Sequence, residues 1–232
     1  MSSETSPQKP RILAGLLRFL LFLGMAFGLL FWPAGRWDLP FLWAYIGVFF
    51  AGAVAGIVTM QRTDPTLMQE RVKPGPGGKD PKLRLYGILM FATHWALAGL
   101  DVGRRHWSDS VPLAVQIAGL AGLASAFGLS CWAISANRFY SSDVRIQRDR
   151  GHHLITGGPY RFLRHPGYAS AMLMVLCSPL ALGSYLSAFP ALAFVPLLFR
   201  RLFREEKLLT AELEGYAEYA ARTRNRLLPG VW

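Results

Sequence analysis

Long apolar segments separated by short polar ones dominate this chain of 232 residues. Three segments contain no charged residue: 41–60, 111–136 and 166–199. Two more, interrupted only by Arg18 and by His94, are 12–32 and 85–100. A helix that crosses a bilayer needs about 20 mainly apolar residues. The pattern therefore predicts four membrane-spanning helices, at 12–32, 41–60, about 83–103 and 111–136.

The apolar segment 166–199 is too long for one straight span. Its 34 residues would form a helix of roughly 51 Å, against a hydrocarbon core of about 30 Å. Because Gly183 and Ser184 lie near its centre, we predict a hairpin of two helices, about 166–182 and 186–203, that turns there. One long, tilted and kinked helix is the alternative. With the hairpin, the sequence predicts an all-α, polytopic transmembrane bundle of about six spans.

The charge pattern orients this bundle. The chain has 25 Lys and Arg against 14 Asp and Glu, a formal charge of +11, and only two cysteines, which argues against a disulfide scaffold. With a cytoplasmic N-terminus, 21 of the 25 basic residues lie in the inside segments, which are 1–11, 61–84, 137–165 and 199–232. Since Lys and Arg concentrate in cytoplasmic loops, we expect both termini in the cytoplasm. Basic residues that flank helix ends form no continuous basic face, so nucleic acid is not an expected partner.

Three segments of different character follow from this arrangement. Residues 1–11 are predicted to be a disordered cytoplasmic tail. Residues 12–136 hold four spans with a cytoplasmic loop at 61–84. A cleaved signal peptide is the alternative for the first span, although its apolar run of 21 residues exceeds a typical signal core. Residues 137–232 hold a polar loop, the hairpin and a cytoplasmic amphipathic helix, which is expected from apolar residues near helical spacing: Leu209, Leu213, Tyr216, Ala220 and Leu227.

The segment 137–165 concentrates polar and aromatic side chains beside the membrane. His165 precedes Pro166, and proline suits the first position of a helix. The free N–H groups and partial positive charge of that helix start favour a carboxylate or phosphate. Farther along, Arg201 and Glu205 are four residues apart and so share one helix face. These features predict a site for a polar ligand; an ordinary basic loop and an interfacial salt-bridge patch are the alternatives.

Several short motifs follow one another in the last hundred residues. They are Gly158-Pro159-Tyr160-Arg161, Arg164-His165-Pro166-Gly167-Tyr168, Glu205-Glu206, Gly215-Tyr216-x-x-Tyr219, Arg222 and Leu228-Pro229-Gly230. Together they resemble the isoprenylcysteine carboxyl methyltransferase family, and more narrowly its bacterial members, over residues 137–232. The resemblance implies an enzyme of the bacterial inner membrane that uses S-adenosylmethionine without a soluble Rossmann-type domain. The sequence agrees, because no strand is followed by G-x-G-x-x-G.

The same resemblance implies roles for individual residues. Arg201 would hold the methyl acceptor, and Glu205 would bind the cofactor from the last helix. The other implied cofactor-binding residues are Gln147, His152, Leu154, Ile155, Tyr160, His165, Pro166 and Tyr168. No metal is implied. Two departures from the family pattern stand out: Gly167 replaces a Ser or Met, and the run from Glu206 to Tyr216 is one residue shorter than in eukaryotic members, which makes Glu206 the substitute for Glu205.

The chemistry suits these groups. A carboxylate acceptor is already ionised at neutral pH, so methyl transfer to it requires alignment, which a bidentate arginine supplies, rather than a general base. We therefore expect methyl transfer to a lipid-like or amphiphilic acceptor, most simply a carboxylate, in contact with membrane lipids. A phospholipid-type N-methyltransferase, an NADPH-dependent membrane reductase of sterols or lipids, and a non-catalytic protein with a decayed pocket are the alternatives.

Overall fold

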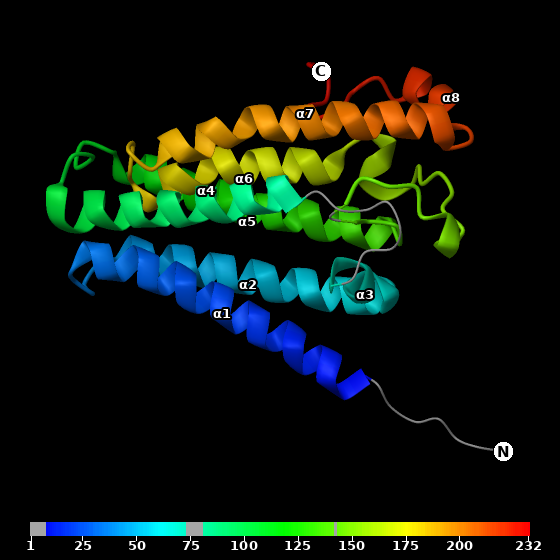
Figure 1. The fold of residues 1–232 in the computed structure, drawn as a ribbon. Helices are drawn as coiled ribbons and strands as arrows, with labels where there is room; N and C mark the ends of the chain where they lie inside the picture. Colours follow the sequence, from blue (N-terminus) through cyan, green and yellow to red (C-terminus); the bar gives the residue numbers. More distant parts are fainter. Residues whose placement is uncertain (1–7, 73–80, 142) are drawn as a thin grey trace.

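The computed structural model describes residues 8–72, 81–141 and 143–232. Within these ranges the chain forms helices and loops and no β-strand, as the all-α prediction requires. Of the tail predicted at 1–11 and the loop predicted at 61–84, residues 1–7 and 73–80 lie outside the described residues. The described part of the tail belongs to the first helix, and the described part of the loop contains a short helix. The helices are α1 (Gln8–Ala34), α2 (Pro40–Thr63), α3 (Thr66–Val72), α4 (Pro81–Leu100) with a π-helical turn (Asp101–Arg105), α5 (Leu113–Ala136), α6 (Pro166–Leu182), α7 (Ala188–Glu212) and α8 (Tyr216–Arg222). The long helices lie side by side in one bundle, with α3 and α8 at the same end (Figure 1).

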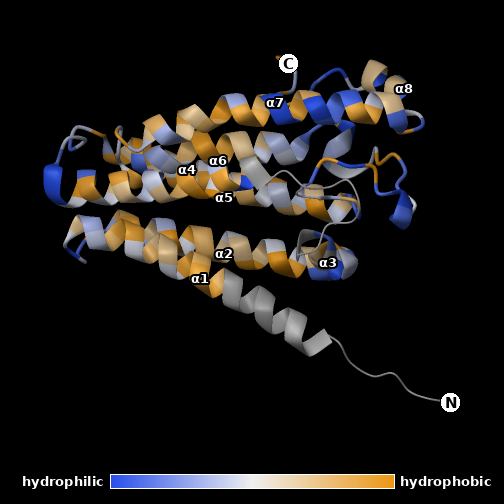
Figure 2. Cartoon of the chain, in the orientation of Figure 1, coloured by the Kyte–Doolittle hydropathy of each residue, from blue (hydrophilic) through white to orange (hydrophobic). Residues whose placement is uncertain are grey.

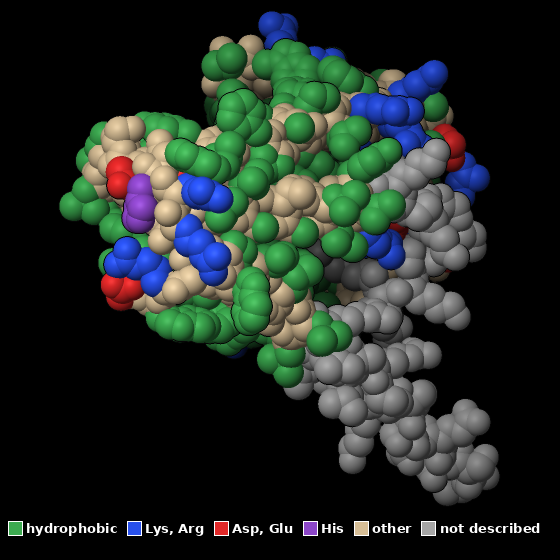
Figure 3. Space-filling view, turned by 60° about the vertical axis from the view of Figure 1, so that its left-hand side comes forward, with side chains coloured by type: hydrophobic (Ala, Val, Ile, Leu, Met, Phe, Trp, Pro, Cys, Tyr) green, Lys and Arg blue, Asp and Glu red, His purple; other side chains and the backbone are tan. Residues whose placement is uncertain are grey.

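The surface of this bundle is that of a membrane protein. Three helical segments are long and apolar enough to cross a bilayer: Pro40–Thr63, Leu83–Arg105 and Leu113–Ala136. Two shorter apolar helices are Phe19–Ala34 and Pro166–Leu182. Large apolar side chains such as Ile88, Ile117 and Phe189 are about half exposed or more, and hydrophobic residues spread over the flanks of the bundle (Figures 2 and 3). Because exposed apolar surface of this extent is unfavourable in water, the protein is an integral membrane protein.

The predicted C-terminal hairpin is confirmed. α6 ends at Leu182, and Gly183 takes a left-handed conformation with φ of 69° that closes the helix. α7 begins at Ala188 and returns along α6 (Figure 1). The alternative of one long kinked helix is wrong, because the chain reverses direction at the glycine.

The end of the chain differs from the sequence-based prediction. α7 does not stop near residue 203 but continues to Glu212, and this last part is mostly hydrophilic (Figure 2). The amphipathic helix after it is therefore shorter than expected: α8 has seven residues, with Tyr216 and Tyr219 buried. Gly215, with φ of 75°, separates the two helices, because a left-handed residue cannot continue a right-handed helix.

Small residues allow α5 and α6 to pack closely. A Cβ atom on Gly119 would lie 2.3 Å from the backbone nitrogen of Ala181, and one on Gly122 would lie 2.4 Å from Sγ of Cys177. In a bilayer, close packing of this kind does much of the work that the hydrophobic effect does in water. It holds α6 against α5, so the loop that joins them leaves and re-enters the bundle at the same end.

A series of buried hydrogen bonds joins α2, α4 and α6 toward the end opposite α8. Trp95 Nε1 donates to Tyr45 Oη at 3.0 Å, and Tyr45 Oη lies 2.8 Å from Ser178 Oγ. Ser178 Oγ lies 2.7 Å from His94 Nε2, while His94 Nδ1 lies 2.9 Å from the carbonyl oxygen of Ser187. A carbonyl only accepts, so Nδ1 carries the proton and Nε2 accepts from the serine. All five residues are thereby fixed to one another inside the bundle.

The π-helical turn contributes a second buried polar group nearby. The carboxylate of Asp101, which is fully buried, accepts from the backbone N–H of Ser108 at 3.1 Å and from its hydroxyl at 2.6 Å. It also accepts from the hydroxyl of Ser184, in the hairpin turn, at 2.5 Å. Since an unpaired buried carboxylate is costly, these bonds hold the hairpin turn onto the end of α4.

Ser178→Ala is expected to lower the thermal stability of the protein. Removal of the hydroxyl leaves His94 Nε2 and Tyr45 Oη without this buried partner, at a cost of about 1–3 kcal/mol. The measurement is the melting temperature of the purified protein in detergent. Ser125→Ala is the matched control, because the exposed Ser125 hydroxyl bonds only to the carbonyl of Ala121 in its own helix. Equal melting temperatures for the two variants would contradict this assignment.

Candidate functional site

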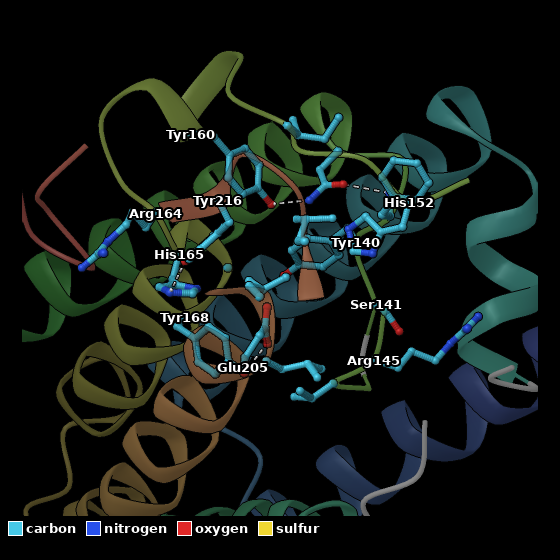
Figure 4. A pocket seen from close by; sticks show the side chains of 18 of the residues that line it. Tyr140, Ser141, Arg145, His152, Tyr160, Arg164, His165, Tyr168, Glu205 and Tyr216 are labelled. Atoms are coloured by element: carbon cyan, nitrogen blue, oxygen red, sulfur yellow. Dashed lines mark hydrogen bonds between the residues drawn. The ribbon is translucent and has the colours of Figure 1, made fainter. Parts of the chain in front are cut away.

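A cavity of about 260 Å³ lies at the α8 end of the bundle and is lined by the loop after α5, the start of α6, the second half of α7 and α8 (Figure 4). All ten residues that the sequence singled out lie in its wall: Gln147, His152, Leu154, Ile155, Tyr160, His165, Pro166, Tyr168, Arg201 and Glu205. Their roles remain predictions. Other wall residues received no role from the sequence, although two of them belong to one of its short motifs: Asn137, Phe139, Tyr140, Tyr216 and Tyr219.

The first turn of α6 and the middle of α7 meet in this cavity. The hydroxyl of Tyr168 donates to Glu205 Oε2 at 2.7 Å and accepts from Arg201 Nε at 3.0 Å. The spacing of four residues places Arg201 and Glu205 on one face of α7, as predicted. The tyrosine therefore links the cation and the anion of the cavity in one hydrogen-bonded group.

Glu206 faces a different environment from its neighbour. Its carboxylate forms an ion pair with Arg164 at 2.8 Å and accepts from Arg226 Nε at 2.7 Å. It does not line the cavity, whereas Glu205 does. The ambiguity between the two adjacent glutamates is resolved geometrically in favour of Glu205 as the cavity-facing residue.

His165 is the residue that precedes α6, with Pro166 in the first helical position, and its side chain makes no capping hydrogen bond. Its ring is buried and its Nε2 lies 3.4 Å from Tyr216 Oη. Burial lowers the pKa of His165, against the opposing effect of Glu205 and Glu206. The imidazole at the helix start is therefore neutral at neutral pH.

The chain after α8 supports this corner through its backbone. The N–H groups of Arg164 and His165 donate to the carbonyls of Asn225 and Arg226 at 2.9 and 3.1 Å. The C-terminal segment thus pairs with the residues that immediately precede α6. Sequence spacing alone gave no signal for this long-range pairing.

Tyr160 is buried between Asn137, in the loop after α5, and Tyr219 of α8. Asn137 Nδ2 donates to its hydroxyl at 3.0 Å, and Tyr219 donates to its backbone carbonyl at 2.7 Å. Burial raises the pKa of the Tyr160 hydroxyl. Asn137 directly follows the apolar segment 111–136 and Tyr219 belongs to a recognised motif, so both carried a signal, but only their contacts reveal the role.

His152 is held in the cavity wall by the loop itself. Its Nδ1 accepts from the backbone N–H of Gln147 at 3.2 Å, and its ring packs on Phe139 with centroids 4.6 Å apart. The fully buried Gln147 side chain donates to the carbonyl of Phe139 at 2.7 Å. Burial, reinforced by the neighbouring His153, Arg145 and Arg150, lowers the pKa of His152 to about 4. With Nδ1 accepting, the neutral ring carries its proton on Nε2.

We expect the stability of the protein to fall as the pH is lowered from about 6.5 toward 4, in part through His152. The unfolded chain binds this proton near the ordinary pKa of 6.5, whereas the folded chain binds it only near 4, so protons favour unfolding in this window. Melting temperatures at pH 7.5, 6 and 5 test this. His165 contributes in the same direction, so His152→Asn should reduce the loss without removing it. An identical loss in wild type and variant would contradict a shifted His152.

Gly167 allows Tyr140 to pack against the first turn of α6. A Cβ atom at this position would lie 2.8 Å from both Cε2 and Oη of Tyr140. The departure from the Ser or Met of the resembled family thus has a structural counterpart: the tyrosine ring occupies the space that a larger residue would need.

The cavity is chemically mixed. Glu205 offers a carboxylate, Arg201 a guanidinium, and the tyrosines offer hydroxyl groups, while Ala171, Leu198 and Leu208 provide apolar wall. Within the described residues, no three His, Cys, Asp or Glu side chains are grouped to hold a metal ion. A ligand with charged and apolar parts fits this wall.

Comparison with known proteins adds an independent finding. Residues 118–211 match the isoprenylcysteine carboxyl methyltransferase family, so the resemblance is confirmed over this segment. A probable protein-S-isoprenylcysteine O-methyltransferase of Oryza sativa subsp. indica is 30% identical over 105 residues, which cover 40% of this chain and 50% of the rice protein. Protein-S-isoprenylcysteine O-methyltransferase B of Arabidopsis thaliana is 30% identical over 100 residues, 38% of this chain and 46% of its own length. The chain thus spans about half the length of these relatives.

A third relative carries a different name. The cobalt-zinc-cadmium resistance protein CzcN of Cupriavidus metallidurans is 26% identical over 144 residues, which cover 59% of this chain and 60% of that protein. The family match includes α6 and most of α7 but ends before α8 and the C-terminal segment.

Proposed function

We propose that this protein is an S-adenosylmethionine-dependent methyltransferase of the membrane that methylates a carboxylate on a lipid-like or amphiphilic acceptor. The observation that carries the proposal is the group formed by Arg201, Tyr168 and Glu205 in one cavity wall, inside the segment that matches a methyltransferase family. The guanidinium and the carboxylate of this group, joined through one tyrosine hydroxyl, can bind an anionic part of one ligand and a cationic part of another.

The cavity wall suits this cofactor. S-adenosylmethionine bears a sulfonium, an ammonium and a carboxylate beside an adenosine. Glu205 complements the positive groups, and the start of α6 at Pro166 favours the carboxylate. Apolar and aromatic residues around Leu154 and Tyr216 suit the adenosine. The neutral His152 adds a donor without adding a positive charge beside the sulfonium.

The acceptor end follows from Arg201. The bound cofactor supplies an electrophilic methyl group, and the protein has to align an ionised carboxylate with it. A guanidinium aligns a carboxylate through paired hydrogen bonds. Ala171 and Leu198, on the same wall and nearer the middle of the bundle, suit an apolar chain attached to that carboxylate. No general base is required, because the acceptor is ionised at neutral pH.

The same proposal includes the orientation. We infer that the α8 end faces the cytoplasm of a bacterial cell, because the basic residues concentrate in the loops at this end. The cofactor then enters from the cytoplasm, and the acceptor enters from the bilayer.

The test has two stages. Purified full-length protein in detergent is first titrated with S-adenosylhomocysteine and, as a comparison, with NADPH. Binding of the first and not of the second is expected; binding of NADPH alone would favour the reductase alternative. Membranes that contain the protein are then incubated with S-adenosylmethionine labelled in the methyl group.

The labelled lipid product identifies the bond that was made. A methyl ester releases its label as methanol in mild base, whereas an N-methyl group stays attached. Base-labile label supports the carboxylate acceptor. Base-stable label would replace it by the phospholipid-type N-methyltransferase, and absence of cofactor binding would overturn the proposal.

A further inference from the structure

Two ion pairs connect the corner between α2 and α3 with the loop that forms the cavity. Arg145 donates through Nε and Nη2 to the two carboxylate oxygens of Glu70, at 2.7 and 2.8 Å. Arg150 Nη2 donates to Asp64 Oδ2 at 3.2 Å and to the hydroxyl of Thr66 at 2.6 Å. Asp64 and Glu70 lie before residue 118, outside the segment that matches the family.

The Arg145–Glu70 pair is buried although it lies at an end of the bundle. The two side chains are only 4% and 6% exposed. Arg145 also bonds to Asp149, so all three guanidinium nitrogens have carboxylate partners. Burial of such a pair carries a large desolvation cost and is a poor source of stability, which favours a role in fixing one conformation.

Arg150 connects its ion pair to the cavity through Gln147, whereas Arg145 belongs to the cavity loop itself. Arg150 Nη1 donates to the amide oxygen of Gln147, whose other amide atom is bonded to Phe139. The backbone N–H of Gln147 donates to Nδ1 of His152, and the backbone N–H of His152 donates to the carbonyl oxygen of Gln147, at 3.2 Å each. The loop from 145 to 152 is thus fixed at one side by α3 and presents His152 to the cavity at the other.

The side chain and the backbone of Arg145 are placed differently with respect to the cavity. The Arg145 side chain extends away from Glu205 and Tyr168, while its backbone belongs to the cavity loop (Figure 4). Its guanidinium therefore holds the loop from the side away from Glu205 and does not face the centre of the site.

We propose that Glu70 and Asp64 are positioning residues of the cavity, which set the cofactor-binding loop through Arg145 and Arg150. The inference rests on the proposed function, since it assigns the loop to the cofactor. The first half of the chain thereby contributes to the site, because Glu70 in α3 sets the geometry of the cavity loop through Arg145.

The experiment measures the dissociation constant of S-adenosylhomocysteine by calorimetry, with full-length protein in detergent at 10 °C. Glu70→Gln is expected to weaken binding on the order of tenfold, because a small displacement of the loop misplaces its contacts. Asp64→Asn tests the second pair and is expected to weaken binding less. Glu212→Gln is the matched control: it removes an exposed ion pair with Arg148 of the same loop and should leave affinity unchanged.

A double variant distinguishes positioning from general destabilisation. If Glu70 acts through Arg145, then Glu70→Gln with Arg145→Gln should weaken binding no more than the stronger single change. Additive losses, or a Glu70→Gln protein that binds like wild type, would overturn the inference. If Glu70→Gln does not yield folded protein, Asp64→Asn decides the question. Binding by Asp64→Asn as tight as that of wild type would likewise overturn the inference. Failure of the wild-type protein to bind would instead overturn the proposed function.

Discussion

Arg201→Ala is expected to slow methyl transfer by about 100-fold or more, while the affinity for S-adenosylhomocysteine stays close to that of wild type. The guanidinium lies in the cavity wall and bonds to Tyr168, where it can align an acceptor carboxylate. Misplacement of a reacting group by about 1 Å is enough for a loss of this size. Initial rates of label transfer from S-adenosylmethionine into a membrane extract, together with calorimetry, provide the measurement.

Two further variants sharpen this prediction. Arg200→Ala removes an exposed neighbouring charge and should leave the rate unchanged. Arg201→Lys keeps the charge but loses the planar pair of donors, so an intermediate rate is expected. An unaffected rate in Arg201→Ala would show that this residue does not hold the acceptor. Loss of cofactor binding in the same variant would move Arg201 to the cofactor half of the site.

Glu206→Ala is expected to destabilise the protein by about 3 kcal/mol, the lower end of the cost of removing one partner of a buried ion pair, because this pair is largely rather than fully buried. Its carboxylate holds Arg164, next to the start of α6, and Arg226, in the C-terminal segment. Without it, the largely buried Arg164 loses an anionic partner, and the C-terminal segment loses its ionic contact to α7. The melting temperature in detergent is the measurement.

The matched control is Glu212→Ala, on the same helix. Glu212 and Arg148 are both exposed, and an exposed pair contributes at most about 1 kcal/mol. Glu205→Gln provides the complementary comparison, because it should abolish cofactor binding with a smaller loss of melting temperature. If Glu206→Ala melted like Glu212→Ala, the ion pairs around Glu206 would not support the fold.

The two glutamates illustrate where sequence reasoning reaches its limit. Adjacent residues on a helix point about 100° apart, so one of them faces the cavity and the other does not. A motif of two adjacent glutamates does not state which. The choice depends on Arg164, Tyr168 and Arg226, which other segments bring to α7.

The end of α7 illustrates a second limit. The apolar pattern stops near residue 200, but the helix continues to Glu212. Hydropathy reports the solvent around a helix, whereas the length of the helix depends on its backbone bonds and on where a residue such as Gly215 interrupts it.

The sequence by itself determined the helical class, the three apolar segments long enough to cross a bilayer, the hairpin turn at Gly183 and ten of the residues that line the cavity. These follow from segment length, periodicity and short motifs, which are local properties of the chain. The tertiary structure decided that Glu205 rather than Glu206 faces the cavity, that α3 holds the cavity loop through Glu70 and Arg145, and that the C-terminal segment pairs with the start of α6. Each of these depends on contacts between residues that are far apart in the chain, and no local pattern records such contacts.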